Sequence, residues 1–194
     1  MYIIIIRSLI FMFVLITPLH CLAKDVYTIN DKTVEKVMKH IFSANVKIAK
    51  DHLPYYVAGD FNYDGIQDVA VLFYPQKNYK LSQQIQSCWP WALSDGMQSN
   101  TLHKSLAIIN GHPDGWMSPK TKVFVFFDNS GTLETPSFQL IIKKRSEKDY
   151  PQLLRILPTS KTGDIIILPT EAGIDTYIYW NKSAYELHIP SEEP

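Results

Sequence analysis

Residues 59–72 constrain the fold of this chain more than any other part of the sequence. Oxygen-bearing side chains fall at loop positions 1, 3, 5 and 9, with a glycine at position 6: Asp60, Asn62, Asp64, Asp68 and Gly65. Calcium takes about six to eight oxygen ligands, and alternate residues of a tightly curled loop can point at one ion. Three carboxylates at this spacing would repel one another without a cation between them. We therefore predict one structural Ca²⁺, held by these four side chains and by the backbone carbonyl of Ile66.

The segments on either side of this loop predict strands. An EF-hand needs a glutamate at loop position 12 and a helix on each side, but position 12 here is Val71 within an apolar run. The residues before the loop, Tyr55-Tyr56-Val57-Ala58, are rich in β-favouring side chains. We therefore expect a hairpin over residues 55–74 with the metal loop at its turn.

The pattern Gly-Asp-Phe-Asn-x-Asp-Gly-x-x-Asp-Val-Ala-Val-Leu resembles the calcium loop of FG-GAP repeats, which occur in the β-propeller of integrin α chains and in many secreted bacterial proteins. A propeller needs several blades, and this chain carries a single copy of the motif. The chain also resembles small secreted bacterial proteins that carry one such loop. This resemblance implies that calcium fastens a hairpin. A catalytic or regulatory calcium, and a metal-free turn rich in Asp and Asn, remain alternatives.

Residues 1–23 have the pattern of a secretory signal peptide. Arg7 supplies a positive charge, an apolar stretch runs over 9–19, and small residues stand before a cleavage site after Ala23. We expect a mature protein that begins at Lys24, lies in the bacterial periplasm or outside the cell, and has no membrane segment. A retained membrane anchor and lipidation at Cys21 are the alternatives.

Composition narrows the function further. Lys and Arg number 19, as do Asp and Glu, and this balance gives no electrostatic basis for nucleic-acid binding. After cleavage Cys88 is the one remaining cysteine, so the mature chain has no internal disulfide, which suits a bacterial periplasm. We interpret Cys88 as a small buried side chain.

Periodicity predicts a single α+β domain over residues 24–194, with one amphipathic helix packed on a mainly antiparallel sheet. The helix is expected over 31–50, capped by Asp31, with apolar residues at three- and four-residue steps. Turns are expected at 129–131 and 181–183. Strands are expected at 55–59, 68–74, 104–110, 122–128, 137–144, 152–157, 164–168, 175–181 and 184–189.

Residues 75–103 differ from the rest because they are polar and then reach Trp89-Pro90-Trp91. A long insertion between strands often carries function. Trp89 and Trp91, together with Trp116 in a turn-rich loop, are a candidate recognition surface. The alternative is that these rings cover the end of the core.

The sequence contains no Gly-x-Ser-x-Gly, His-Glu-x-x-His, phosphate-binding or Cys-x-x-Cys motif. We therefore favour a calcium-stabilised periplasmic protein that binds another protein, such as an inhibitor or immunity protein. An envelope hydrolase or carbohydrate-binding protein that uses the Trp89 and Trp91 loop is the alternative.

Overall fold

A computed structural model describes residues 29–76, 85–87, 103–128, 133, 138–169, 173 and 175–190. The predicted signal peptide, Cys88, Trp89, Trp91 and the predicted turn at 129–131 lie outside the described residues. None of the helices in the described part is long and apolar enough to cross a membrane.

The described chain contains two helices and ten strands. In chain order they are α1 (Asp31–Phe42), β1 (Val46–Ile48), β2 (Tyr56–Gly59), β3 (Asp68–Pro75), β4 (Ile85–Ser87), β5 (Ser105–Ile109), β6 (Val123–Phe127), β7 (Ile141–Lys143), α2 (Tyr150–Leu153), β8 (Ile165–Leu168), β9 (Thr176–Trp180) and β10 (Tyr185–His188).

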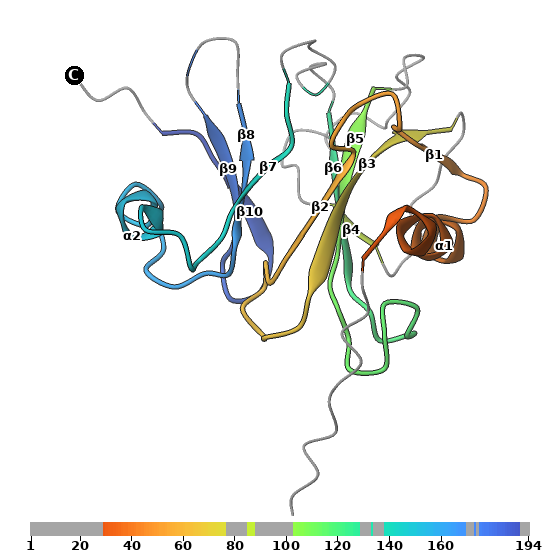
Figure 1. Cartoon of the computed structure of the whole chain (residues 1–194), viewed down its shortest axis with the longest axis horizontal. Coiled ribbons are helices and arrows are strands. Elements are labelled where there is room, and N and C mark those ends of the chain that lie inside the picture. The colour runs from red at the N-terminus through yellow and green to blue at the C-terminus, as the bar shows by residue number, and fades with distance from the viewer. Residues whose placement is uncertain are drawn as a thin grey trace, which may run out of the picture.

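The strands form two sheets rather than the single sheet that was predicted. The first has the order β1-β3-β5-β6-β4, with β2 also paired to β3, and the second has the order β10-β9-β8-β7 (Figure 1). Every strand pair is antiparallel except β4 with β6. The predicted mainly antiparallel pairing of the strands is therefore confirmed, in a domain that is richer in strand than the predicted α+β class suggests.

The two sheets pack face to face, and a helix covers the outer face of each (Figure 1). On β3, Val69, Val71 and Phe73 pack with the buried face of α1, whereas Ala70 and Leu72 pack with residues of the second sheet. Side chains alternate across a strand, so a strand between two apolar layers is apolar at every position. This explains the continuous apolar run that follows the predicted metal loop.

Helix α1 begins where the sequence indicates and ends earlier than predicted. The N-cap is Asn30, whose side chain accepts a hydrogen bond from the Thr33 N–H at 3.0 Å, while Asp31 lies in the first turn. The helix ends at Phe42 because Ser43 has a φ of 56°, in the left-handed region. The prediction of helix over residues 43–50 is therefore wrong, and β1 occupies part of that range.

One predicted strand is also wrong. Residues 152–157 contribute to the short helix α2 and to the turns after it, with Pro151 in the first turn of the helix. Proline fits this position because the first helical N–H groups have no intrahelical acceptor. The predicted hairpins at 55–74 and around 181–183 are confirmed by the antiparallel pairing of β2 with β3 and of β9 with β10.

Candidate metal centre

The predicted metal loop connects β2 to β3 and has the tight curl that its glycine suggested. Gly65 has a φ of 80° and Tyr63 a φ of 64°, both in the left-handed region. Glycine adopts this conformation without steric cost. The loop thus turns sharply at the position where the sequence places its one glycine.

Side chains at loop positions 1, 3 and 5 accept hydrogen bonds from backbone N–H groups further along the loop. Asp60 Oδ1 accepts from the N–H of Asp64 (3.0 Å) and its Oδ2 accepts from that of Gly65 (3.1 Å). Asn62 Oδ1 also accepts from Asp64 N–H (3.1 Å), and Asp64 Oδ1 accepts from the N–H of Ile66 (2.7 Å). These bonds curl the backbone around its own polar side chains.

Asp68, at loop position 9, is fully buried. Its Oδ2 accepts hydrogen bonds from the N–H groups of Phe61 (2.8 Å) and Asn62 (3.1 Å), and its Oδ1 accepts from the N–H of Gly111 (2.7 Å). The Gly111 bond reaches the segment that follows β5. Asp68 therefore ties the start of the loop to β3 and to the neighbouring chain segment.

Asp164 links the same loop to the second sheet. Asp164 N–H donates to the Asp60 carbonyl (2.8 Å), and Asp60 N–H donates to Asp164 Oδ2 (3.1 Å). Asp164 Oδ1 also accepts from the N–H of Arg145 (2.8 Å). Because Asp60 follows β2 and Asp164 precedes β8, the loop is a joint between the two sheets.

Glycines let the chain segments around the loop approach closely. A β-carbon at Gly163 would lie 2.1 Å from the Asp60 carbonyl oxygen, and one at Gly111 would lie 2.4 Å from the Gln67 carbonyl oxygen. Both distances are far inside van der Waals contact. The backbone at Gly111 and at Gly163 therefore packs directly against the loop, because neither residue has a side chain.

The acidic groups of the loop repel one another. Burial raises the pKa of the Asp60 carboxyl, and the charges of Asp64 and Asp164 raise it further, against the lowering effect of its backbone N–H bonds. Burial raises the pKa of Asp68 to about 7, and the charge of Asp64 adds to this shift, while the N–H groups that Asp68 accepts from lower it. A cation among these carboxylates would favour their ionised forms.

Two cationic side chains lie against the tip of the loop. The guanidinium of Arg145 stands 3.7 Å and the ammonium of Lys161 4.9 Å from the centre of the Tyr63 ring. Contacts of this kind are attractive because the face of an aromatic ring is negative. Both cations come from the chain around the second sheet, so they add to the contacts between that sheet and the loop.

The donor set of the loop fits a hard cation in its chemistry, since an ionised carboxylate has about four acceptor sites. The hydrogen bonds described above occupy two of these acceptor sites on the Asp60 carboxylate and three on the Asp68 carboxylate. The Asp64 carboxylate accepts one hydrogen bond from the Ile66 N–H and a second from the Asn62 side-chain amide (2.9 Å). Across the described residues, however, no group of three or more His, Cys, Asp or Glu side chains is placed to hold a metal ion.

Trp116 does not lie on an exposed surface. It is 8% exposed and packs in the cluster between α1 and the first sheet. Its indole N–H donates to the Gln67 carbonyl at 2.8 Å. The tryptophan therefore packs in the core and binds the end of the metal loop. Trp116 thus does not belong to the exposed recognition surface that was predicted for Trp89, Trp91 and Trp116.

The contacts from the second sheet were not predicted. Asp164 follows Asp60 in the chain by 104 residues, and the one local signal is the Gly163-Asp164 pair directly before a strand. The loop residues themselves were predicted from spacing.

Function has to be inferred from this loop and its surroundings, because comparison of the chain with protein-family models, with curated proteins and with solved structures found no match.

Proposed function

We propose that the protein is a secreted, calcium-stabilised binding module of the bacterial envelope whose partner is another protein. The N-terminal signal pattern supports export, and the spacing of Asp60, Asn62, Asp64 and Asp68 supports calcium. The resemblance to FG-GAP loops supports a structural role for the ion.

The observation that carries this proposal is the position of the loop at the joint between the sheets. Asp68 binds the N–H of Gly111 beside the first sheet, and Asp60 exchanges hydrogen bonds with Asp164 beside the second. The same carboxylates repel one another. A bound Ca²⁺ would remove that repulsion and hold the ends of both sheets together, as a disulfide does in other exported proteins.

A role in binding rather than in catalysis is favoured by the sequence, which lacks the Gly-x-Ser-x-Gly, His-Glu-x-x-His, phosphate-binding and Cys-x-x-Cys motifs named above. A small exported domain of this kind suits an inhibitor or immunity protein that blocks an enzyme or toxin acting in the envelope. In such a protein calcium stabilises the binding surface and does not contact the partner.

Affinity capture tests the proposal. The mature protein, immobilised and exposed to envelope extract, should retain a specific protein in calcium and lose it in chelator in proportion to the fraction that unfolds. A column carrying the heat-unfolded protein is the control. Retention of no protein beyond that control, or turnover of an envelope polysaccharide by the purified chain, would contradict the proposed binding role.

A further inference from the structure

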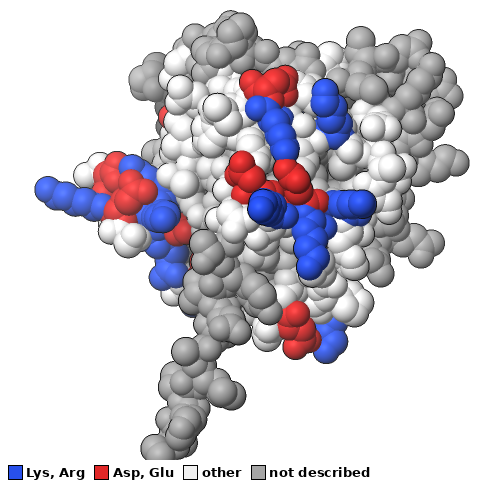
Figure 2. All heavy atoms as spheres, turned by 45° about the vertical axis from the view of Figure 1, so that its right-hand side comes forward, with Lys and Arg blue, Asp and Glu red and all other residues white. Residues whose placement is uncertain are grey.

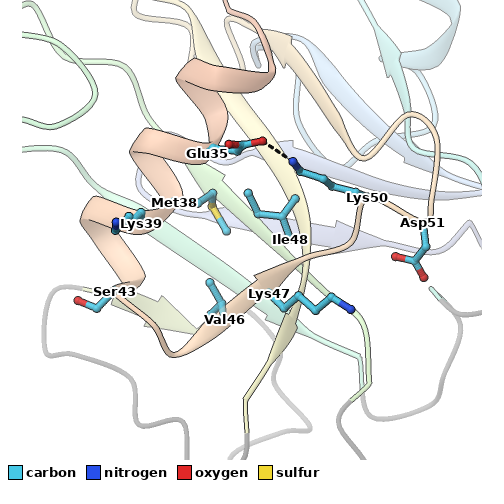
Figure 3. A pocket seen from close by; sticks show the side chains of 9 residues that line it. All are labelled: Glu35, Met38, Lys39, Ser43, Val46, Lys47, Ile48, Lys50 and Asp51. Carbon is cyan, nitrogen blue, oxygen red and sulfur yellow. Dashed lines mark hydrogen bonds and ion pairs between the residues drawn. The ribbon is translucent and has the colours of Figure 1, made fainter.

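A groove runs between α1 and β1 on the outer side of the first sheet (Figure 3). Its volume is about 460 Å³, within the range of about 300–1,000 Å³ typical of ligand sites. The apolar side chains of Met38, Val46 and Ile48 line it. Met38 is buried, whereas Val46 and Ile48 are half-buried and extend the apolar cluster beneath α1 toward solvent.

The rim of the groove is basic. Lys39, Lys47 and Lys50 line it together with Glu35 and Asp51. The two acids are already engaged, because Glu35 pairs with Lys50 and Asp51 accepts a hydrogen bond from the Tyr74 hydroxyl at 2.8 Å.

The side chains of Lys39 and Lys47 are exposed and form no hydrogen bond or ion pair with the residues that the structure describes. The hydrogen bond from Tyr74 and, to a smaller extent, the positive charge of Lys47 lower the pKa of Asp51. Figure 2 shows lysine and arginine side chains on this face, interspersed with aspartate and glutamate side chains. The groove therefore offers positive charge beside an apolar floor.

One edge of β1 has no strand beside it within the described part of the chain, because β1 ends the path of the first sheet. Backbone hydrogen bonds join Gln76 N–H to the Asn45 carbonyl and Ala49 N–H to the Leu72 carbonyl. In an antiparallel pair such bonds recur at alternate residues. Both backbone groups of Val46 and the N–H of Ile48 therefore point away from β3, toward this edge. The Ile48 carbonyl already accepts a hydrogen bond from the Lys50 N–H at 3.0 Å.

We propose that this edge of β1 binds an extended, acidic segment of a partner protein as an added strand. This inference rests on the proposed role in protein binding and names its surface. Side chains of an added strand alternate between two faces. On one face, apolar side chains would continue the row of Val46 and Ile48 above Met38. On the other face, acidic side chains would lie beside Lys47, whereas Lys39, on α1, adds positive charge on the apolar side of the groove.

A short synthetic peptide of alternating glutamate and valine is the probe, with binding measured by titration calorimetry. The charge-reversed variant Lys39→Glu/Lys47→Glu should weaken its binding at least about tenfold, since residue 47 would repel the acidic side chains beside it and residue 39 would no longer add positive charge to the groove. That variant should instead prefer the matching lysine and valine peptide. The matched control is Lys144→Glu/Lys148→Glu, which changes the same charge at exposed sites beside α2 and should alter binding less than about twofold.

Backbone pairing is tested with the same glutamate and valine peptide carrying N-methyl groups, which remove its N–H donors and should abolish binding. The proposal is overturned if the wild type does not bind the probe, if both charge-reversed variants weaken it equally, or if the N-methylated peptide binds as well. Thermal melts of the variants establish that they are folded. An envelope protein captured equally by the wild type and by Lys39→Glu/Lys47→Glu would leave the proposed function standing and overturn this groove as its site.

Discussion

Replacing Gly163 with alanine should lower the free energy of unfolding by about 3 kcal/mol or more, because the added methyl group has no room. The new β-carbon would lie 2.1 Å from the carbonyl oxygen of Asp60 and 2.3 Å from that of Phe61. These are backbone atoms of the hydrogen-bonded loop and cannot move aside as a flexible side chain would. For a domain of this size the melting temperature should fall by roughly 6–12 °C.

The matched control is Gly115→Ala. Gly115 has a φ of 93° but open space around its Cα, so alanine there incurs the cost of a left-handed conformation alone, about 1–2 kcal/mol. If Gly163→Ala melts within about 2 °C of the wild type, the loop is not packed against the segment before β8 in the way described.

Replacing Asp68 with alanine should cost about 3–5 kcal/mol, even in the presence of a chelator. The substitution leaves the N–H groups of Phe61, Asn62 and Gly111 without their acceptor, and each buried unpaired group costs about 1–3 kcal/mol. Asp64→Ala is the control, because Asp64 is exposed and its bond to Ile66 N–H can be replaced by water. It should cost less than about 1 kcal/mol in chelator.

Denaturant unfolding in chelator gives both free energies. If Asp68→Ala and Asp64→Ala lose the same free energy of unfolding, the buried hydrogen bonds of Asp68 stabilise the loop no more than the exposed bonds of Asp64 do.

Local sequence signals predicted the parts of this fold that local forces determine. The hairpin β2–β3 was predicted because Gly65 and the alternating Asp and Asn residues specify a turn between two β-favouring runs. The start of α1 was predicted within one residue of its N-cap. Its end was not, because Ser43 gives no glycine signal and Ile48 continues the helical spacing of Ile41 and Ala44.

The remaining errors come from contacts between distant residues. An apolar run such as Leu153, Leu154, Ile156 and Leu157 fits a strand or a short helix, and packing against the outer face of the second sheet decides between them. Alternation indicates that a strand has a buried face but not which sheet contains it. Asp164 joins the candidate site across 104 residues, and no local pattern carries that information.

Calcium binding is tested most directly by thermal melts of the mature wild type and of Asp64→Asn, each in calcium and in chelator. Asparagine keeps an oxygen that can accept from Ile66 N–H but removes one carboxylate charge. At a free calcium concentration about 100-fold above the dissociation constant, the wild type should gain about 2.7 kcal/mol, or roughly 5–11 °C.

Asp64→Asn should gain less from calcium, and in chelator it should melt no lower than the wild type, because one of the mutually repelling carboxylates is gone. Identical wild-type curves in calcium and in chelator would contradict the assignment of loop 60–68 as a calcium site.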